Sequence, residues 1–360
     1  DWKGTNFTGD IVNDGVIVAS SIGILLTGTT FTGNVTNNGR VSAVANDTAL
    51  VIDNGTTLTG SVTNTGTLNG QVDGIAVNAT GTITGDIVNT TTGTIVGDSD
   101  GNATGSGIRI SGLVQGSIIN DGLIDPVNGI IVTGSVDGGI FNSGTILGKS
   151  AGIDISGATT DQTITLTDGL IQGRNTGVIT TALDMVNGNT DTFSAEGGIL
   201  DGDVLADTFD AFLLNGDGTF AYRRGTASGV DHFDANGNGT FVLGSDAEAV
   251  DGEGVTIGAD HMYVLNGTSP LIYLDDDTTI TLVNDLDLDF DTGSAATLEF
   301  FLKAGATTTA PAADYGSIIS GAVGNLGTTA NLTVFLDPVT FAVPGSLSTY
   351  VYESVITNIG

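Results

Sequence analysis

The sequence predicts an all-β protein, a right-handed parallel β-helix (β-solenoid) that forms a single elongated rod. Three observations lead to this prediction. The phrase "FTGDIVNDGVI" at Phe7–Ile17 has close copies along the first half of the chain, its apolar residues alternate with polar ones, and 56 glycines accompany only 5 prolines among many β-branched residues. Alternating segments separated by glycine are typical of short strands and tight turns. A unit of this size cannot bury its apolar face alone, so successive copies are expected to stack.

The repeat has a fixed register. Its first glycine occurs at intervals of 24, 27, 25, 31 and 22 residues, at Gly9, Gly33, Gly60, Gly85, Gly116 and Gly138. Apolar residues stand two positions before and two positions after each of them, as Phe7 and Ile11 do in the first copy. Because side chains alternate along a strand, these residues share one face, and Thr8 and Asp10 belong to the opposite, polar face.

An asparagine follows the first glycine by four residues in every copy. These residues are Asn13, Asn37, Asn64, Asn89, Asn120 and Asn142. Stacked asparagines can form an amide ladder, in which each side chain bonds to the coils above and below. The same Asn-x-Gly pattern also supplies turns with positive φ. Both interpretations are structural, and the sequence leaves the choice between them open.

A second apolar segment completes each repeat, about fifteen residues after most of the first glycines. It occurs at Ile24–Leu26, Leu50–Ile52, Ile75–Val77, Ile108–Ile110, Ile130–Val132 and Ile153–Ile155. Its residues also alternate between apolar and polar, which indicates a strand. Each repeat is therefore expected to contain two or three short strands and no helix of useful length.

The second half of the chain is less regular and more acidic. Residues 1–180 contain 15 acidic and 5 basic residues, a net charge of −10, and residues 181–360 contain 26 and 3, a net charge of −23. We therefore divide the chain into regular coils with a repeat of about 25 residues at 1–180, less regular acidic coils with loops at 181–303, and a C-terminal cap at 304–360.

The C-terminal segment has features of its own. It reads "YGSIISGAVGNLGTTANLTVFLDPVTFAVPGSLSTYVYESVITNIG" from Tyr315 to Gly360. Tyr315-Gly316, the strand-like Ala330–Leu336, and Gly345 followed by Tyr350–Ile356 resemble the autochaperone-like segment of bacterial autotransporter passenger domains, the type V secretion family. The upstream coils with a Gly-x-Ile-x-Asn-x-Gly pattern suit this family too. The resemblance implies export through the outer membrane, aided by the family's own barrel, which this chain lacks, and display on the bacterial cell surface or release from it.

Charge and composition exclude several classes of protein. The formal net charge is −33, and the chain contains no cysteine. Phosphate recognition depends on basic side chains, so this is not a non-specific nucleic-acid-binding protein. Without cysteine there is no disulfide scaffold, no thiolate nucleophile and no cysteine-ligated zinc.

Few residues suggest catalysis. His232 and His261 are the only histidines, and no Gly-x-Ser-x-Gly context accompanies them. A serine triad is therefore not predicted, and the histidines are expected at the surface or in loops. Arg223-Arg224, next to Tyr222, is the one basic pair, and we expect it to form ion pairs with the surrounding acidic residues.

One segment fits the beginning of a calcium-binding loop. "DANGNG" places side-chain oxygens at Asp234, Asn236 and Asn238, the spacing that opens an EF-hand-like loop. Ser245 occupies the position where such a loop has its glutamate, and the same letters also form a good turn. The acidic residues at 275–277 and at 285, 287, 289 and 291 are further candidates for divalent ions, although the latter alternate like the outward face of a strand.

These observations together favour a non-enzymatic extracellular passenger that acts as an adhesin or structural stalk. Its expected partners are a host or neighbouring cell surface, glycans, or further copies of itself. One alternative is an extracellular protein that forms filaments or a matrix by end-to-end stacking of coils, since uncapped coils expose strand edges. The other is a polysaccharide-degrading β-helix enzyme, which would need paired carboxylates on a common groove.

Overall fold

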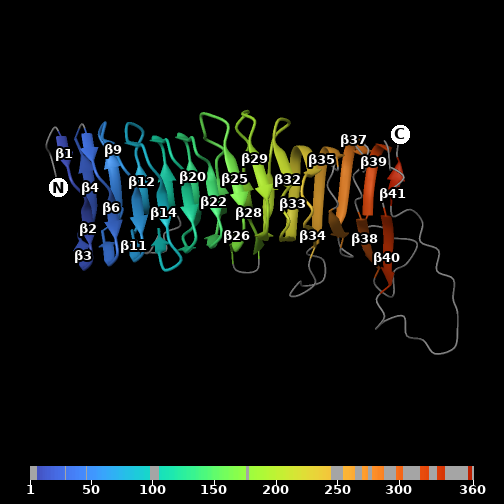
Figure 1. Cartoon of the computed structure of the whole chain (residues 1–360), viewed down its shortest axis with the longest axis horizontal. Helices are drawn as coiled ribbons and strands as arrows, with labels where there is room; N and C mark the ends of the chain where they lie inside the picture. The colour runs from blue at the N-terminus through green and yellow to red at the C-terminus, as the bar shows by residue number, and fades with distance from the viewer. Residues whose placement is uncertain are drawn as a thin grey trace, which may run out of the picture. The chain divides into compact units, whose positions relative to one another are not determined.

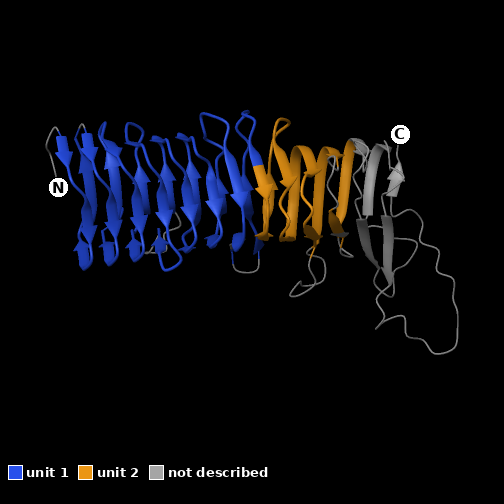
Figure 2. Ribbon diagram, viewed as in Figure 1, with its two compact units in different colours: residues 1–192 blue, residues 193–360 orange. Residues whose placement is uncertain are grey.

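The computed structural model is all-β, and its described residues form strands and no helix (Figure 1). It describes residues 6–28, 30–45, 47–97, 105–175, 178–244, 254–263, 270–274, 278–287, 297–302, 317–323, 331–336 and 356–358. For residues 174, 273 and those after 283, the description covers the backbone alone. The chain forms two compact units, residues 1–192 and 193–360 (Figure 2). The sequence had placed the change of regularity at residue 180.

Each of the first coils in unit 1 contains four short strands, one more than the sequence analysis allowed. The first coil contains β1 (Asn6–Thr8), β2 (Ile11–Asn13), β3 (Val16–Ala19) and β4 (Ile24–Thr27). The second repeats them as β5 (Thr30–Thr32), β6 (Val35–Asn37), β7 (Arg40–Ala43) and β8 (Leu50–Asp53). The additional strand is the one that precedes the first glycine of the repeat. This strand is two or three residues long, which allows the chain to turn sharply at the corner of the coil that follows it.

Equivalent strands of successive coils pair in parallel and form four columns (Figure 1). The first column continues through β9 (Thr57–Thr59), β13 (Thr82–Ile83), β17 (Leu113–Val114) and β21 (Ser135–Val136). The second continues through β10 (Val62–Asn64), β14 (Ile87–Asn89), β18 (Ile118–Asn120), β22 (Ile140–Asn142) and β25 (Thr163–Leu166). The third continues through β11 (Thr67–Asn69), β15 (Thr94–Val96), β19 (Leu123–Ile124), β23 (Thr145–Gly148) and β26 (Leu170–Asn175). The fourth continues through β12 (Asp73–Val77), β16 (Ser106–Ile110), β20 (Asn128–Val132), β24 (Ala151–Asp154) and β28 (Thr181–Asp184).

The core of unit 1 is a continuous aliphatic stack. Ile11 pairs with Val35, Val35 with Val62, and Val62 with Ile87. The last three are buried, with at most 1% of their surface exposed. Because the same position of every coil faces inward, each coil covers the apolar face of the next. The predicted parallel β-solenoid is confirmed. The one antiparallel pairing in the described part of unit 1 joins β26 to β27 (Val178–Ile179).

Unit 2 has longer strands and a different repeat. It begins within β29 (Thr192–Ala195) and continues with β30 (Gly198–Asp201), β31 (Asp203–Leu205), β32 (Ala211–Leu214), β33 (Thr219–Ala235), β34 (Thr240–Leu243), β35 (Val255–Tyr263), β36 (Leu271–Leu274), β37 (Thr279–Asp287), β38 (Thr297–Leu302), β39 (Ser317–Val323), β40 (Asn331–Leu336) and β41 (Ile356–Asn358). The 17-residue β33 pairs with β34 near its start and with β35 further along. Its register shifts between Ala227 and Val230. Parallel stacking therefore continues on longer strands.

Aromatic side chains fill the core of unit 2. Phe193, Phe212, Phe220 and Phe233 are fully buried. The rings of Phe193 and Phe212 meet edge to face with centroids 4.8 Å apart, and those of Phe212 and Phe233 do so at 5.1 Å. These are favourable geometries for aromatic pairs. The core of unit 2 therefore contains packed rings in addition to aliphatic side chains of the kind that form the core of unit 1.

Candidate functional site

The six asparagines of the repeat form one continuous ladder inside unit 1. In each case the side-chain Nδ2 donates to Oδ1 of the asparagine in the next coil. The distances are 2.7 Å for Asn13–Asn37, 2.8 Å for Asn37–Asn64, 2.9 Å for Asn64–Asn89, 2.8 Å for Asn89–Asn120 and 2.7 Å for Asn120–Asn142. All five bonds point the same way, so the amide dipoles align and strengthen one another.

The same side chains also close the turns that follow them. Nδ2 of Asn64 donates to the carbonyl oxygen of Gly66 at 3.1 Å and to that of Thr94, one coil further on, at 3.2 Å. The equivalent atoms of Asn37 and Asn120 repeat this pattern. Asn64 has no exposed surface, and a buried amide of this kind must find partners for its polar atoms. The ladder and the turn are therefore two roles of one residue.

The second glycine of the repeat is required by the close approach of the coils. A Cβ atom added to Gly66 would collide with the carbonyl oxygen of Gly39 in the preceding coil, and one added to Gly39 would collide with that of Gly15. The backbone could make room only by separating the coils, which would stretch the neighbouring ladder bonds. The Asn-x-Gly pattern is therefore a single structural device.

A second polar column, absent from the sequence analysis, follows the first glycine. Its members share a short side chain with an oxygen atom, and each oxygen accepts the backbone N–H of the equivalent residue in the next coil. The bonds run from Asn34 N to Asp10 Oδ1 (2.7 Å), Ser61 N to Asn34 Oδ1 (3.0 Å), Asp86 N to Ser61 Oγ (3.0 Å) and Ser117 N to Asp86 Oδ1 (2.8 Å). The signal was present as a position that is Asp, Asn or Ser in five successive copies.

Arg109 joins neighbouring coils on the fourth column. Its Nε lies 2.8 Å from Oδ2 of Asp73, a carboxylate with 1% of its surface exposed. Its remaining nitrogens donate to Asn78 and Ser111, each at 3.3 Å. A buried carboxylate needs such a partner, because leaving it unpaired costs several kcal/mol. This arginine therefore has a structural role within unit 1.

The two histidines lie on strands, and the side chain of His232 is 41% exposed, which agrees with the surface position that the sequence allowed. His232 on β33 is in register with His261 on β35, and their rings stack with centroids 5.6 Å apart. His232 Nδ1 is 3.6 Å from Asp234 Oδ2, and His261 Nδ1 is 3.0 Å from the hydroxyl of Tyr263. Burial raises the pKa of Asp234, although the backbone N–H of Tyr263 and the two imidazoles oppose this shift.

Of the three predicted calcium ligands, Asp234 and Asn238 use their side chains for contacts between coils. Oδ1 of Asp234 accepts the backbone N–H of Tyr263 at 3.0 Å. In the turn after β33, Nδ2 of Asn238 lies 3.3 Å from Oδ1 of Asp217, while Oδ1 of Asn236 is buried without a hydrogen-bond partner among the described residues. No group of three or more His, Cys, Asp or Glu side chains that could hold a metal ion occurs in the described part of the chain. Calcium binding here stays a prediction.

Several acidic candidates cannot be placed. The acidic residues 275–277, 289 and 291 lie outside the described residues, as does Ser245, and residues 285 and 287 are described on β37 by their backbone alone. Most of the C-terminal segment that carries the autotransporter resemblance also lies outside, apart from β39, β40 and β41.

Arg224 forms the ion pair that the sequence suggested, and it does so inside the core of unit 2. Its Nε and one terminal nitrogen donate to the two carboxylate oxygens of Asp201 at 2.6 and 2.8 Å. Only 5% of the arginine and 1% of the aspartate is exposed. Next to them the hydroxyl of Tyr222 donates to the carbonyl oxygen of Gly202, and burial raises the pKa of Tyr222 well above its ordinary value.

Comparison with known proteins found no relative of this chain. No protein-family profile, curated protein or solved structure matches the chain. No helix long and apolar enough to cross a bilayer is found in the part of the chain that the structure describes. The proposed function therefore rests on the hydrogen bonds and ion pairs inside the two units.

Proposed function

We propose that this chain is a non-enzymatic extracellular passenger, exported through the outer membrane, that serves as a structural stalk or adhesin. The observation that carries the proposal is the unbroken asparagine ladder from Asn13 to Asn142. It runs alongside four columns of parallel backbone pairing and the column of side-chain-to-backbone bonds that starts at Asp10. Every coil of unit 1 is thus fastened to the next at several points around its circumference.

Such an arrangement suits a molecule that bears load along its stack of coils. A pull applied along the stack would act on many hydrogen bonds of each coil interface at once, so that no single bond carries the force. The interfaces are formed by near neighbours in the sequence, which also suits folding that advances coil by coil. Both properties are useful to a chain that emerges through a membrane and then projects from a cell.

The net charge of the chain limits the classes of partner that an adhesin of this kind could bind. With a formal charge of −33, the chain repels anionic lipid surfaces and nucleic acids. Neutral glycans, proteins with basic patches, or further copies of the chain are compatible with this charge. The resemblance of Tyr315–Gly360 to autotransporter passengers supports the proposed route of export.

Antibody labelling of the source bacterium tests the location. An antibody against residues 1–192 should label intact cells, and external protease should remove the label. Labelling that requires permeabilised cells would contradict the proposal. Loss of cell attachment on deletion of the gene, restored by the wild-type chain, would support the adhesive role, whereas unchanged attachment would leave the stalk as the proposed role.

Two assays address the alternative functions. Release of reducing ends from a panel of polysaccharides by the purified chain would replace the proposal with the enzymatic alternative. Negative-stain electron microscopy of the same material should show separate particles. Regular filaments of the purified chain would instead favour end-to-end assembly.

A further inference from the structure

The turn between β8 and β9 is exposed and has an unusual backbone. Asn54 and Gly55 have φ values of 55° and 75°, and the N–H of Thr56 donates to the carbonyl oxygen of Asp53 at 3.2 Å. This is the pattern of a type I′ turn, which favours Asn-Gly. Among the described residues, Asn54 is the one non-glycine residue with a positive φ. We propose that Asn54 is the principal site of spontaneous deamidation and isomerisation in the described part of this protein.

The chemistry requires only the chain and water. The backbone nitrogen of Gly55 attacks Cγ of Asn54, the new N–Cγ bond closes a succinimide ring, and the side-chain nitrogen leaves as ammonia. Water then opens the ring at either carbonyl, which yields aspartate or isoaspartate. The net reaction is the exchange of an amide for a carboxylate, with no change of oxidation state. Glycine favours the attack because it has no Cβ, and a Cβ built at Gly55 would have no neighbour within 4 Å, so the turn is open on that side.

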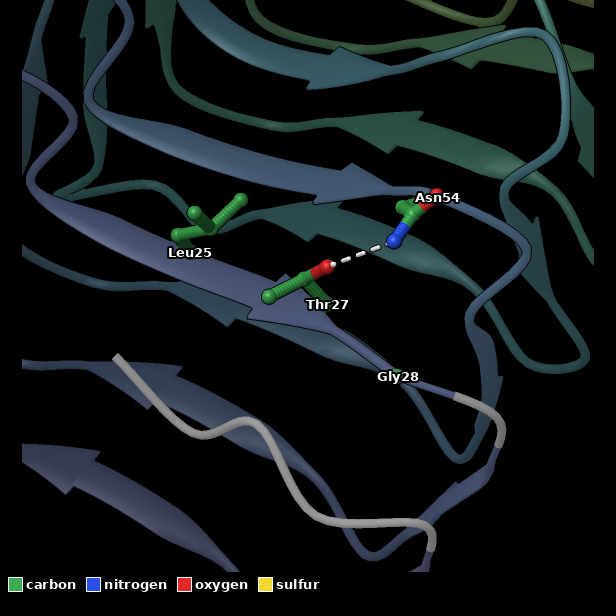
Figure 3. Close-up of a pocket in the computed structure, with 4 residues that line it drawn as sticks. All are labelled: Leu25, Thr27, Gly28 and Asn54. Atoms are coloured by element: carbon green, nitrogen blue, oxygen red, sulfur yellow. Dashed lines mark hydrogen bonds between the residues drawn. The ribbon is translucent and has the colours of Figure 1, made fainter.

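The carboxamide of Asn54 is accessible and weakly held. It borders an open depression of about 500 Å³ whose lining also includes Leu25, Thr27 and Gly28 (Figure 3). Its one hydrogen bond with another side chain in that view is from Nδ2 to the hydroxyl of Thr27, at 3.4 Å (Figure 3). A bond of that length is weak. The side chain can therefore rotate toward the Gly55 nitrogen, and water can reach the succinimide.

The nitrogen of Gly55 also differs from its counterparts. The sequence contains nine Asn-Gly pairs, at Asn38, Asn54, Asn69, Asn128, Asn187, Asn215, Asn236, Asn238 and Asn266. At four of them the glycine N–H donates to a backbone carbonyl of another coil: Gly39 to Asn13, Gly70 to Val96, Gly237 to Leu214 and Gly239 to Gly216. Gly55 N–H donates instead to the side-chain hydroxyl of Thr80, at 2.9 Å. Because Thr80 is exposed, this bond opens more readily than a bond in the coil interface.

Other pairs are protected on the asparagine side. The Asn187 side chain bonds to Asp191 Oδ2 at 2.7 Å, to the Ile155 carbonyl at 2.9 Å and to the N–H of Asn189 at 2.7 Å. Nδ2 of Asn215 donates to Ser194 at 2.7 Å. Asn128-Gly129 lies within strand β20, and residue 266 lies outside the described residues. The sequence alone ranks these pairs as equals, and the structure separates Asn54 from them.

The product would change the turn without dismantling the coil. A new carboxylate would stand beside Asp53, whose Oδ1 accepts the N–H of residue 54 at 2.7 Å. Isoaspartate would also lengthen the main chain of the turn by one carbon. The flanking strands remain paired with neighbouring coils, so the change stays local.

Peptide mapping by mass spectrometry of the intact folded chain, aged in mildly alkaline buffer, tests the proposal. The peptide with Asn54 should accumulate aspartate and isoaspartate several-fold faster than those with Asn38, Asn69 or Asn187. In urea the rates of these peptides should converge, because the structural differences are lost. A folded chain in which another described Asn-Gly pair reacts first, or in which all react alike, would overturn the proposal.

Two variants sharpen the test. Asn54→Gln should remove the early product and leave the slower sites unchanged. Thr80→Val frees the Gly55 nitrogen at an exposed position and should accelerate the reaction at Asn54. An unchanged rate in Thr80→Val would contradict the restraining role assigned to this hydroxyl. Circular dichroism of each variant verifies that the fold is retained.

Discussion

The asparagine ladder predicts a specific loss of stability when one member is removed. Asn64→Ala deletes the donor that satisfies Oδ1 of Asn89, a residue with 1% of its surface exposed. An orphaned buried acceptor costs about 1–3 kcal/mol. Nδ2 of Asn37 loses its ladder acceptor but keeps the carbonyls of Gly39 and Thr67, and each net hydrogen bond lost adds about 0.5–1.5 kcal/mol. The free energy of unfolding should therefore fall by about 2–4 kcal/mol.

Asn142→Ala is the matched control. Asn142 is as fully buried as Asn64, accepts the same ladder bond, and donates to two carbonyls in the same way. The residue in register with it in the next coil is Leu166, so its removal leaves no side-chain acceptor without a donor. The cost of this variant should be smaller than that of Asn64→Ala by about 1–3 kcal/mol, the penalty of the orphaned acceptor.

Urea denaturation followed by circular dichroism gives both values. The comparison is between the two variants, so errors in the denatured-state reference largely cancel. Equal losses, or a larger loss for Asn142→Ala, would refute the ladder as the source of the stabilisation. The ladder would be refuted equally if Asn64→Ala caused no measurable loss in the free energy of unfolding.

Three further predictions concern single sites. Burial and the neighbouring Asp154 raise the pKa of Asp184, while the N–H of Val186 opposes the shift; the stability this group contributes is complete below the ordinary aspartate pKa and is lost as the pH rises through the raised value. Asp184→Asn should therefore be more stable than wild type at neutral pH by about 0.2–1 kcal/mol, a small gain because solvent screens the repulsion between Asp154 and Asp184. When the urea midpoints of the two proteins are compared in acid, this difference should vanish. Arg224→Met removes the guanidinium that donates to both carboxylate oxygens of the buried Asp201, and it should lower the free energy of unfolding by about 3–5 kcal/mol. Adding Asp201→Leu should recover most of the loss in the same titration; a double variant no better than the single one would count against the pairing. Gly66→Ala should lower the thermal midpoint more than Gly55→Ala, measured by differential scanning calorimetry, because the first forces two coils apart, whereas the second enters open space and costs only the strain of a positive φ.

The sequence predicted unit 1 well because its information is local and repeated. The alternation around each first glycine set the inward face, and the constant asparagine position indicated a ladder or a turn, both of which the structure contains. The strand type that begins with β1 was missed because two or three residues are too short to show a periodicity. The column from Asp10 to Ser117 was missed because Asp, Asn and Ser look different as letters, although each offers an acceptor oxygen at the same place.

Unit 2 depended on contacts that the sequence does not display. Arg224 pairs with Asp201, 23 residues away, and many acidic residues of this chain were equally plausible partners. The register of β33 shifts at a bulge between Ala227 and Val230, which breaks the periodicity that identifies an inward face. His232 and His261 meet because β33 and β35 pair in register, and that pairing is itself a result of the tertiary fold.

The order of the asparagine side chains along unit 1 is the most direct test of the stacked coils. Nuclear Overhauser spectra of protein labelled with ¹⁵N at asparagine should connect the side-chain amide protons of Asn37 to those of Asn13 and Asn64, with slow exchange against solvent. The Asn64→Ala variant assigns these signals, because it removes the contacts on both sides of position 64. Rapidly exchanging side-chain amides, or amide contacts confined to residues near in the sequence, would contradict the parallel in-register stack.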